Sequence, residues 1–190
     1  SKIYGEDKPG TPLLVFHGLF GMLDNWGSFG KEMGELFPVH LIDLRNHGKS
    51  FHSAEMSHDD LAHDIAHYME FHHIEKANLL GHSLGGKAVM QFAIKYPIKV
   101  QKLIVVDIAP KAYPPHHQGI LKALESVDFE KITTRQEAEG VLQQYIPEKS
   151  VIQFLAKNLY WKDDKKLDWR FNLKTLSERY SEFVSNAIKF

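Results

Sequence analysis

Short apolar runs alternate with longer helical patterns along the first 110 residues. The apolar runs, each of strand length, cover residues 12–16, 39–44, 77–80 and 103–106. Three of them are rich in Val, Ile and Leu without polar alternation, which is typical of parallel strands buried on both faces. Segments of helical length lie between them, over residues 25–36, 57–73 and 84–96. Strands separated by helices predict right-handed crossovers and a doubly wound, mostly parallel α/β sheet.

The pattern changes after Pro110, where Pro114 and Pro115 interrupt the chain. From there the sequence is helical in character, with expected helices over residues 118–127, 134–145, 149–159 and 173–188. We therefore predict an α/β core over residues 1–110 and a helical cap over residues 111–190. An unrelated helical domain is the alternative. The cap is favoured because open α/β sheets bind ligands outside the carboxyl ends of their strands.

Composition narrows the classes of function. The chain is 43% hydrophobic and 25% charged, with a formal net charge of −1, so it has no basic surface of the kind that binds nucleic acid or an anionic membrane. No apolar run is long enough to span a bilayer. The absence of cysteine excludes a disulfide framework, a thiolate nucleophile and a cysteine-ligated metal site. We expect a cytoplasmic protein that acts on a small neutral molecule and holds no metal.

The strongest chemical signal is the segment Gly81-His82-Ser83-Leu84-Gly85, between an expected strand and an expected helix. This is the context of a G-x-S-x-G nucleophile elbow, in which a strained turn presents the serine hydroxyl. Gly81 and Gly85 fit such a turn, because side chains there would collide. The alternative is a glycine-rich turn with an incidental serine. The combination of motif and context favours Ser83 as a nucleophile.

A second motif, His17-Gly18-Leu19-Phe20-Gly21, directly follows the first apolar run. Acyl transfer needs two backbone N–H donors for the oxyanion of the tetrahedral intermediate. One is expected from the residue after the nucleophile, Leu84, and the other from this loop, with Leu19 preferred over Phe20. His17 could be a catalytic base, but histidines at such loops usually brace them, and we favour that role.

Two aspartates follow apolar runs and compete for the role of catalytic acid. Asp107, in the segment VVDIAP, directly follows the apolar run over residues 103–106. Its carboxylate is therefore expected at the same sheet edge as Ser83. The chain order of serine before aspartate also fits this class of site. Asp43 precedes the serine, and we interpret it with Arg45 and His47 as part of a hydrogen-bonded turn. A structural role for Asp107, capping the next turn, is the alternative.

Six segments occur in the order HGLFG, DLRNHGKS, GHSLGGKAVM, VVDIAP, VIQFLAKN and WRFN. Together they resemble the YbfF-like esterases of the α/β-hydrolase superfamily, over almost all of residues 13–190. The resemblance implies hydrolysis of short- to medium-chain carboxylic esters, with acyl-thioesters as a further class, and no cofactor. It places the nucleophile on Ser83, the acid on Asp107 and the oxyanion donors on Leu19 and Leu84.

The resemblance also sets an expectation for the C-terminus. Members of that family continue beyond the equivalent of Phe190 with further strands, terminal helices and the catalytic histidine. We therefore expect a fragment that is inactive alone, with the strand before Asp107 left as an exposed apolar edge. The expected partners are a small-molecule ester and the missing C-terminal segment, supplied as a separate piece or by a second copy. After Asp107 the histidines available as a substitute base are His116 and His117, which Pro114 and Pro115 are expected to aim at solvent.

Three functions remain in competition. The first is a serine esterase with an acyl pocket between elbow and cap, lined by Phe20, Phe154 and Trp161 beside the two oxyanion leucines. The second is a catalytically inactive ligand-binding module of the same fold, which the absent histidine would favour. A dehalogenase or epoxide hydrolase is disfavoured because those enzymes carry aspartate in place of Ser83.

Overall fold

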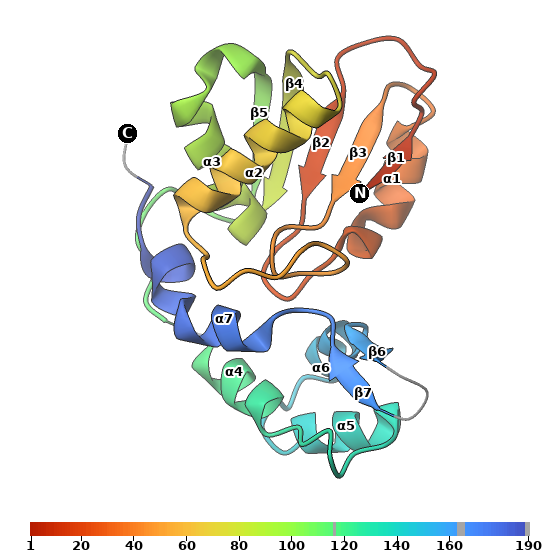
Figure 1. Ribbon diagram of the computed structural model, residues 1–190, viewed down its shortest axis with the longest axis vertical. Coiled ribbons are helices and arrows are strands. Elements are labelled where there is room, and N and C mark those ends of the chain that lie inside the picture. Colours follow the sequence, from red (N-terminus) through yellow and green to blue (C-terminus); the bar gives the residue numbers. More distant parts are fainter. Residues whose placement is uncertain (116, 163–165, 189–190) are drawn as a thin grey trace.

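The computed structural model describes residues 1–115, 117–162 and 166–188, and its centre is a five-stranded sheet (Figure 1). The strands are β1 (Lys2–Tyr4), β2 (Leu13–Phe16), β3 (Val39–Ile42), β4 (Ala77–His82) and β5 (Val100–Val106). Their order across the sheet is β1-β3-β2-β4-β5, and β1 alone among them runs antiparallel to its neighbour. The mostly parallel sheet predicted from the apolar runs is confirmed.

Strand β2 shows why these runs lack polar alternation. Leu13, Leu14, Val15 and Phe16 are all at most 4% exposed. Leu14 and Phe16 belong to the larger hydrophobic cluster, whereas Leu13 and Val15 belong to a smaller cluster on the opposite face. Successive side chains of a strand point to opposite faces, so a strand covered on both sides must be apolar at every position.

Helices cover both faces of this sheet. Helix α1 (Gly27–Met33), preceded by the 3₁₀ turn η1 (Leu23–Trp26), packs on the smaller cluster, and α2 (His58–Phe71) and α3 (Leu84–Lys95) pack on the larger one. Ser57 caps α2 by accepting from the N–H of Asp60 at 3.1 Å, and the Asp60 carboxylate accepts from the Ser57 N–H at 2.9 Å. Such a reciprocal capping box satisfies two otherwise unpaired donors at the start of the helix. A short 3₁₀ turn, η2 (Pro97–Lys99), leads into β5.

The described residues from 118 to 185 lie beyond the carboxyl ends of the parallel strands (Figure 1). They contain α4 (Gln118–Glu125), α5 (Arg135–Leu142), α6 (Lys149–Ala156), β6 (Leu159–Trp161), β7 (Leu167–Trp169), α7 (Leu173–Glu178) and a π-helical turn, η3 (Ser181–Ser185). The expectation that this part is helical throughout is wrong at the antiparallel β6–β7 hairpin. Leu167 and Trp169 are buried on either side of a half-buried Asp168, which is the alternation of a strand. The final predicted helix is also shorter, because α7 ends at Glu178.

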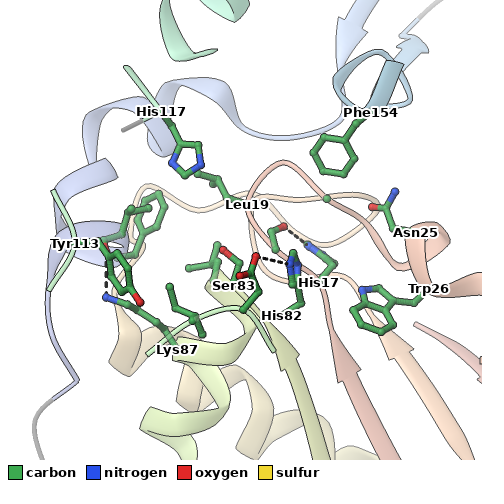
Figure 2. Close-up of a pocket in the computed structure, with 17 residues that line it drawn as sticks. His17, Leu19, Asn25, Trp26, His82, Ser83, Lys87, Tyr113, His117 and Phe154 are labelled. Atoms are coloured by element: carbon green, nitrogen blue, oxygen red, sulfur yellow. Dashed lines mark hydrogen bonds and ion pairs between the residues drawn. The ribbon is translucent and has the colours of Figure 1, made fainter. Parts of the chain in front are cut away.

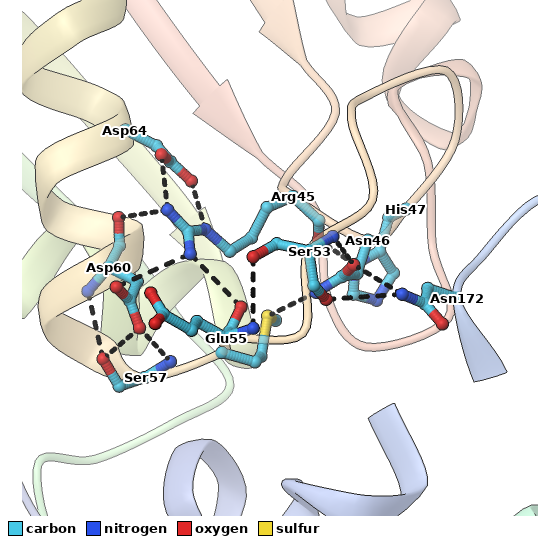
Figure 3. A network of polar contacts seen from close by, with 10 residues as sticks. Arg45, Asn46, His47, Ser53, Glu55, Ser57, Asp60, Asp64 and Asn172 are labelled. Carbon is cyan, nitrogen blue, oxygen red and sulfur yellow. Dashed lines mark hydrogen bonds and ion pairs between the residues drawn. The ribbon is translucent and has the colours of Figure 1, made fainter. Parts of the chain in front are cut away.

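This part of the chain docks directly on the sheet domain. Many of its buried side chains belong to the same hydrophobic cluster as Leu14 and Phe16, and the Phe171 ring lies 5.3 Å from that of Phe20. Polar contacts join the two parts where Asn172 donates its N–H to the carbonyl oxygen of Asn46 at 2.9 Å and its side-chain amide to the Asn46 side-chain oxygen at 3.1 Å (Figure 3).

Two further features of the described residues are the exposed edge of the sheet and the length and polarity of the helices. Strand β5 lies at one edge of the described sheet, where Leu103 and Ile104 are 40% and 43% exposed, so the exposed apolar edge expected there is confirmed for the described residues. Among the described residues, every helix is too short or too polar to cross a bilayer.

Candidate active site

Ser83 occupies a tight turn between β4 and α3. Its backbone has φ 51° and ψ −113°, a conformation that non-glycine residues adopt only under constraint. The N–H of Ser83 donates to the carbonyl oxygen of Val106 at 3.0 Å, and its carbonyl accepts from the N–H of Lys87 at 3.1 Å. These bonds tie the turn to β5 on one side and to the first turn of α3 on the other. The strained strand–helix turn predicted for Ser83 is therefore present.

Two glycines make this turn possible. A Cβ atom on Gly81 would lie 2.2 Å from the carbonyl oxygen of Gly85, and one on Gly85 would lie 2.4 Å from the carbonyl oxygen of Phe16. Both contacts are with backbone atoms, which cannot move aside cheaply. The collision argued from the sequence is thus the physical reason for glycine at both positions.

The loop after β2 lies against the elbow. A Cβ on Gly18 would be 3.3 Å from the Cβ of Ser83, and the N–H of Gly85 donates to the carbonyl of His17 at 3.1 Å. Leu84 is the first residue of α3, so its N–H has no acceptor within the helix. Leu19 and Leu84 both line the pocket above Ser83. The two segments expected to supply oxyanion donors therefore meet at one place, where the chain order across the sheet reverses beside β2.

His17 is held in a bracing role. Its Nε2 accepts from the N–H of Leu44 at 3.1 Å, which requires the ring proton to be on Nδ1, where it donates to the Gly18 carbonyl at 2.8 Å. Burial lowers the pKa of His17 to about 4, so the ring is neutral at neutral pH. With both nitrogens engaged, His17 has none left to accept a proton from Ser83, in agreement with the bracing role favoured from the sequence.

The Asp43 carboxylate accepts hydrogen bonds from the backbone of two loops. It accepts from the N–H of Leu23 at 2.7 Å and from the N–H of Lys49 at 2.9 Å. Nearby, the Arg45 guanidinium donates two hydrogen bonds to the Asp64 carboxylate, at 2.6 and 2.8 Å (Figure 3). Asp43 and Arg45 are thus both engaged in bonds that order this turn, as the sequence suggested.

Asp107 follows β5 directly and has φ 55°. Its side chain is 86% exposed, and Oδ2 lies 3.8 Å from Nε2 of His82. Because His82 and Val106 are paired in the register of β4 and β5, Ser83 and Asp107 leave the sheet as neighbours. The structure therefore brings Asp107, and not Asp43, to the edge of the pocket that contains Ser83.

A pocket of about 780 Å³ lies between the elbow and the α4–α7 part of the chain (Figure 2). Its volume is in the range of small-molecule sites. Its lining includes, besides Ser83 and Asp107, the residues Gly18, Leu19, Asn25, Trp26, His82, Leu84, Lys87, Ile108, Tyr113, His117, Phe154, Phe183 and Val184. Among the described residues, no group of three or more His, Asp or Glu side chains is arranged to hold a metal ion.

Two of the expected acyl-pocket residues are not among those that line it. Trp161 lies in β6, is 56% exposed and is absent from the pocket wall, because the hairpin carries it away from the sheet. Phe20 is 2% exposed and packs under the cap against Phe171 instead of facing the cavity. Phe154, by contrast, faces the pocket from α6, opposite Ser83.

The position of His117 differs from the one expected from the sequence. It lies at the pocket wall, and its Nδ1 is 2.7 Å from the Tyr180 hydroxyl, whereas the preceding prolines were expected to aim it at solvent. The segment before it is bonded to the chain after α7, where the Tyr113 N–H donates to the carbonyl of Ser185 at 3.2 Å and the Pro110 carbonyl accepts from the N–H of Ile188 at 2.7 Å. The neighbouring candidate, His116, falls outside the described residues. The hydrogen bonds found for His17 and His117 go to Gly18 and Leu44, and to Tyr180, and not to the Ser83 hydroxyl.

Lys87 is a pocket residue that the sequence reasoning missed. It is 1% exposed, and its ammonium donates to the carbonyls of Lys111 at 3.2 Å, Val184 at 3.1 Å and Asn186. Burial lowers the pKa of this lysine. Its position four residues after Ser83, on the same helix face, was the signal that could have identified it.

Known proteins with similar sequences and structures support a relationship. Residues 11–132 match the family described as the alpha/beta hydrolase fold. Esterase YbfF of Escherichia coli (strain K12) is 35% identical over 92% of this chain and 67% of its own length. The sn-1-specific diacylglycerol lipase ABHD11 of Danio rerio is 37% identical over 92% of this chain and 57% of its own length.

A solved structure described as a marine microorganism esterase superposes with a TM-score of 0.95 at 37% identity, covering all of this chain and 74% of that one. This chain spans about three fifths to two thirds of the length of the curated relatives that it matches. The resemblance inferred from the six sequence segments is confirmed. With the strand order, the elbow and the family match in agreement, the chain belongs to the α/β-hydrolase fold family.

Proposed function

We propose that this protein is a serine hydrolase of carboxylic esters, with Ser83 as nucleophile and Asp107 as the acid of the triad. The observation that carries the proposal is the strained backbone of Ser83, φ 51°, in the wall of a pocket of about 780 Å³. A strained serine is costly to keep, and it is typical of sites where the strain serves catalysis. The names of the relatives in E. coli and D. rerio, an esterase and a lipase, point the same way.

In the proposed reaction the Ser83 oxygen attacks the ester carbonyl carbon, and its proton passes to a base. The carbonyl oxygen becomes an oxyanion that the N–H groups of Leu19 and Leu84 stabilise. Collapse of this intermediate expels the alcohol, which takes up a proton, and leaves an acyl-enzyme on Ser83. Water then attacks the acyl carbon, releasing the acid and restoring the hydroxyl.

The proton acceptor is the part of this scheme for which we assign no residue. In such sites the base is a histidine oriented by the acid. His17 is committed to its loop, and His117 bonds to Tyr180. We therefore propose that residues 1–190 by themselves turn over esters slowly and that Asp107 orients a histidine from outside them.

The substrates we propose are esters and thioesters with short to medium acyl chains. Phe154 and Phe183 close the pocket from the cap side, which we assign to residues 111–190. Each methylene of an acyl chain gains about 0.8 kcal/mol only while apolar space remains. A cavity of about 780 Å³ bounded by aromatic rings limits that gain. The proposed chemistry requires no cofactor.

The proposal is tested by replacing Ser83 with alanine. In a form of the protein that turns over esters at ordinary enzyme rates, we expect Ser83→Ala to abolish labelling by a fluorophosphonate, seen as an increase in intact mass, and to lower turnover of p-nitrophenyl butyrate to the residual level that the oxyanion site supports. Ser126→Ala, at the C-terminal end of α4, is the matched control and should keep both. Labelling of Ser83→Ala, or turnover at the unmodified rate, would assign the chemistry to another residue.

A ligand-binding module without catalysis is the second candidate. The observation that favours it is that His17 and His117, the histidines beside the pocket, bond to Gly18 and Leu44 and to Tyr180. A module of this kind would bind a butyrate ester with no turnover in any longer form of the protein, and Ser83→Ala would leave its affinity unchanged. Turnover that depends on Ser83 excludes it.

A further inference from the structure

The cap reaches the loop after β2 through one buried side chain, Asn158. This residue follows α6, ends the segment VIQFLAKN and is 1% exposed. Its side-chain amide donates to the carbonyl oxygen of Phe20 at 2.8 Å and to that of Leu155 at 3.2 Å. Both acceptors are carbonyl oxygens, so the side-chain nitrogen and not the oxygen must face them, which fixes the orientation of the amide.

Asn158 is itself rigidly held. Its N–H donates to the carbonyl of Leu155 at 2.9 Å, and its own carbonyl accepts from the N–H of Arg170 at 2.9 Å. The remaining side-chain oxygen is buried and has no partner among the described residues. A buried acceptor left without a partner is destabilising, so docking alone is a poor reason to place asparagine here.

The acceptor on the core side is a strained peptide. Phe20 has φ 58°, which for a bulky residue is strained and persists only where the surroundings enforce it. The Phe20 carbonyl and the Gly21 N–H belong to the same peptide unit. Asn158 binds that carbonyl, while the Gly21 N–H donates to the carbonyl of Gly18 at 2.9 Å. The peptide is therefore held at both ends, and the turn that it closes contains Leu19.

We infer that Asn158 is a positioning residue for the proposed oxyanion donor. By fixing the Phe20 peptide, it sets the direction of the N–H of the preceding residue, Leu19, which lines the pocket. Because Asn158 belongs to the cap, docking of the cap on the core is coupled to the orientation of the proposed oxyanion donor. The inference rests on the proposed function only in the role of Leu19; the coupling of Asn158 to the loop stands on the contacts themselves.

The chain offers a matched control in Asn172, which ends the segment WRFN. Its amide also reaches from the cap to the core, but to Asn46 at 3.1 Å and the carbonyl of Ser53 at 3.3 Å, away from the pocket (Figure 3). Asn158→Ser and Asn172→Ser each remove one such amide, and serine can still cap α7 at position 172. Both variants should lower the melting temperature.

Two readouts separate positioning from docking. We expect Asn158→Ser to reduce kcat for p-nitrophenyl butyrate by about tenfold to a hundredfold with KM changed less than about threefold, because an oxyanion donor is worth about 10²–10³ in kcat. Asn172→Ser should keep kcat within about twofold. Hydrogen exchange of the peptide covering residues 17–22 should become faster in Asn158→Ser and not in Asn172→Ser.

Equal loss of kcat in the two variants, or unchanged exchange of the loop in Asn158→Ser, would overturn the inference. If a form of the protein that includes the proposed base hydrolyses no ester, the proposed function fails, and the exchange comparison alone decides the role of Asn158. If Asn158→Ser does not fold, Asn158→Gln replaces it, with Asn172→Gln as control. Glutamine keeps the donors on a side chain one methylene longer, so the same differences in kcat and exchange are expected at smaller size.

Discussion

The N–H of Ser83 donates to the carbonyl oxygen of Val106 at 3.0 Å, which locks the end of β4 to the end of β5. The residue after Val106 is Asp107, and the register pairs His82 with Val106. One backbone hydrogen bond therefore places the proposed nucleophile and the proposed acid side by side at the same sheet edge. This pairing accounts for how residues 24 positions apart in the sequence can share one site.

The two candidate acids can be separated by matched amides. In a form of the protein that turns over esters, Asp107→Asn should lower kcat by about 10⁴ with little change in KM, because the amide would hold the base in the wrong tautomer. Asp43→Asn should mainly lower the melting temperature, since its carboxylate bonds two backbone N–H groups. Steady-state kinetics with p-nitrophenyl butyrate measure both. A near-normal rate for Asp107→Asn with an inactive Asp43→Asn would reverse the assignment.

Glycine at the elbow is required by space. Gly85→Ala would put a Cβ 2.4 Å from the carbonyl oxygen of Phe16, and we expect it to destabilise the fold by about 1–3 kcal/mol and to remove Ser83 reactivity. Gly140→Ala, in the middle of α5 where no atom lies within 4 Å of the new Cβ, is the control. It should stabilise the protein by up to about 1 kcal/mol. Urea denaturation measures the free energy of unfolding, and fluorophosphonate labelling measures the reactivity of Ser83. A Gly85→Ala protein that is both stable and reactive would contradict the steric argument.

Phe154 should limit acyl-chain length. Phe154→Ala opens the pocket wall from α6, so we expect the preferred p-nitrophenyl ester to shift from butyrate toward octanoate. Each additional accommodated methylene is worth about 0.8 kcal/mol, or roughly fourfold in kcat/KM. Trp161→Ala should leave the preference unchanged, because that side chain is 56% exposed in β6. A shift of equal size in both variants would show that the pocket extends to the hairpin.

The 190 residues alone should be a poor esterase. If the base lies outside these residues, as proposed, only the oxyanion site and substrate binding contribute, which still leaves about 10³–10⁴ over the uncatalysed rate. Neither His116→Ala nor His117→Ala should reduce this residual turnover by more than about twofold. Single-turnover assays on the purified chain decide the matter. Turnover at ordinary enzyme rates that either alanine variant abolishes would identify the base within these residues.

Stability should fall as the pH is lowered through the range where buried histidines become charged. Burial lowers the pKa of His17 to about 4, below its ordinary 6.5, so the unfolded chain binds the proton more readily than the folded one. The contribution of His17 is complete above pH 6.5 and is lost as the pH falls toward 4, by about 3 kcal/mol in total. The same direction holds for His47, whose pKa burial lowers to about 3.

Urea denaturation at pH 7.5, 6 and 5 checks this dependence. His17→Gln should be less stable at pH 7.5, through loss of the bond to Gly18, but should lose less stability between pH 7.5 and pH 5. His63→Gln, on the exposed face of α2, serves as control and should leave the slope as in the unmodified protein. An unchanged slope in His17→Gln would mean that His17 does not carry the titration.

Much of the site could be predicted because its signals are local in sequence. The elbow is encoded within five residues, and the backbone collision that requires Gly81 and Gly85 involves atoms of the same turn and the adjacent strand. The apolar runs likewise predicted four strands, which are β2, β3, β4 and β5. The β6–β7 hairpin was missed because its strands have three residues each, too short for a periodic pattern to show.

The sequence by itself determined the order of strands and helices, the identity of the proposed nucleophile and the loop that faces it, because those follow from local sterics and from hydrophobic period. Only the tertiary structure decided which cap residues enter the pocket. Phe154 faces Ser83 while Trp161 points away, and His117 turns inward against the expectation from its neighbouring prolines. These outcomes depend on contacts between segments far apart in the chain, such as the bond from Asn158 to Phe20, 138 residues apart, for which no local pattern exists.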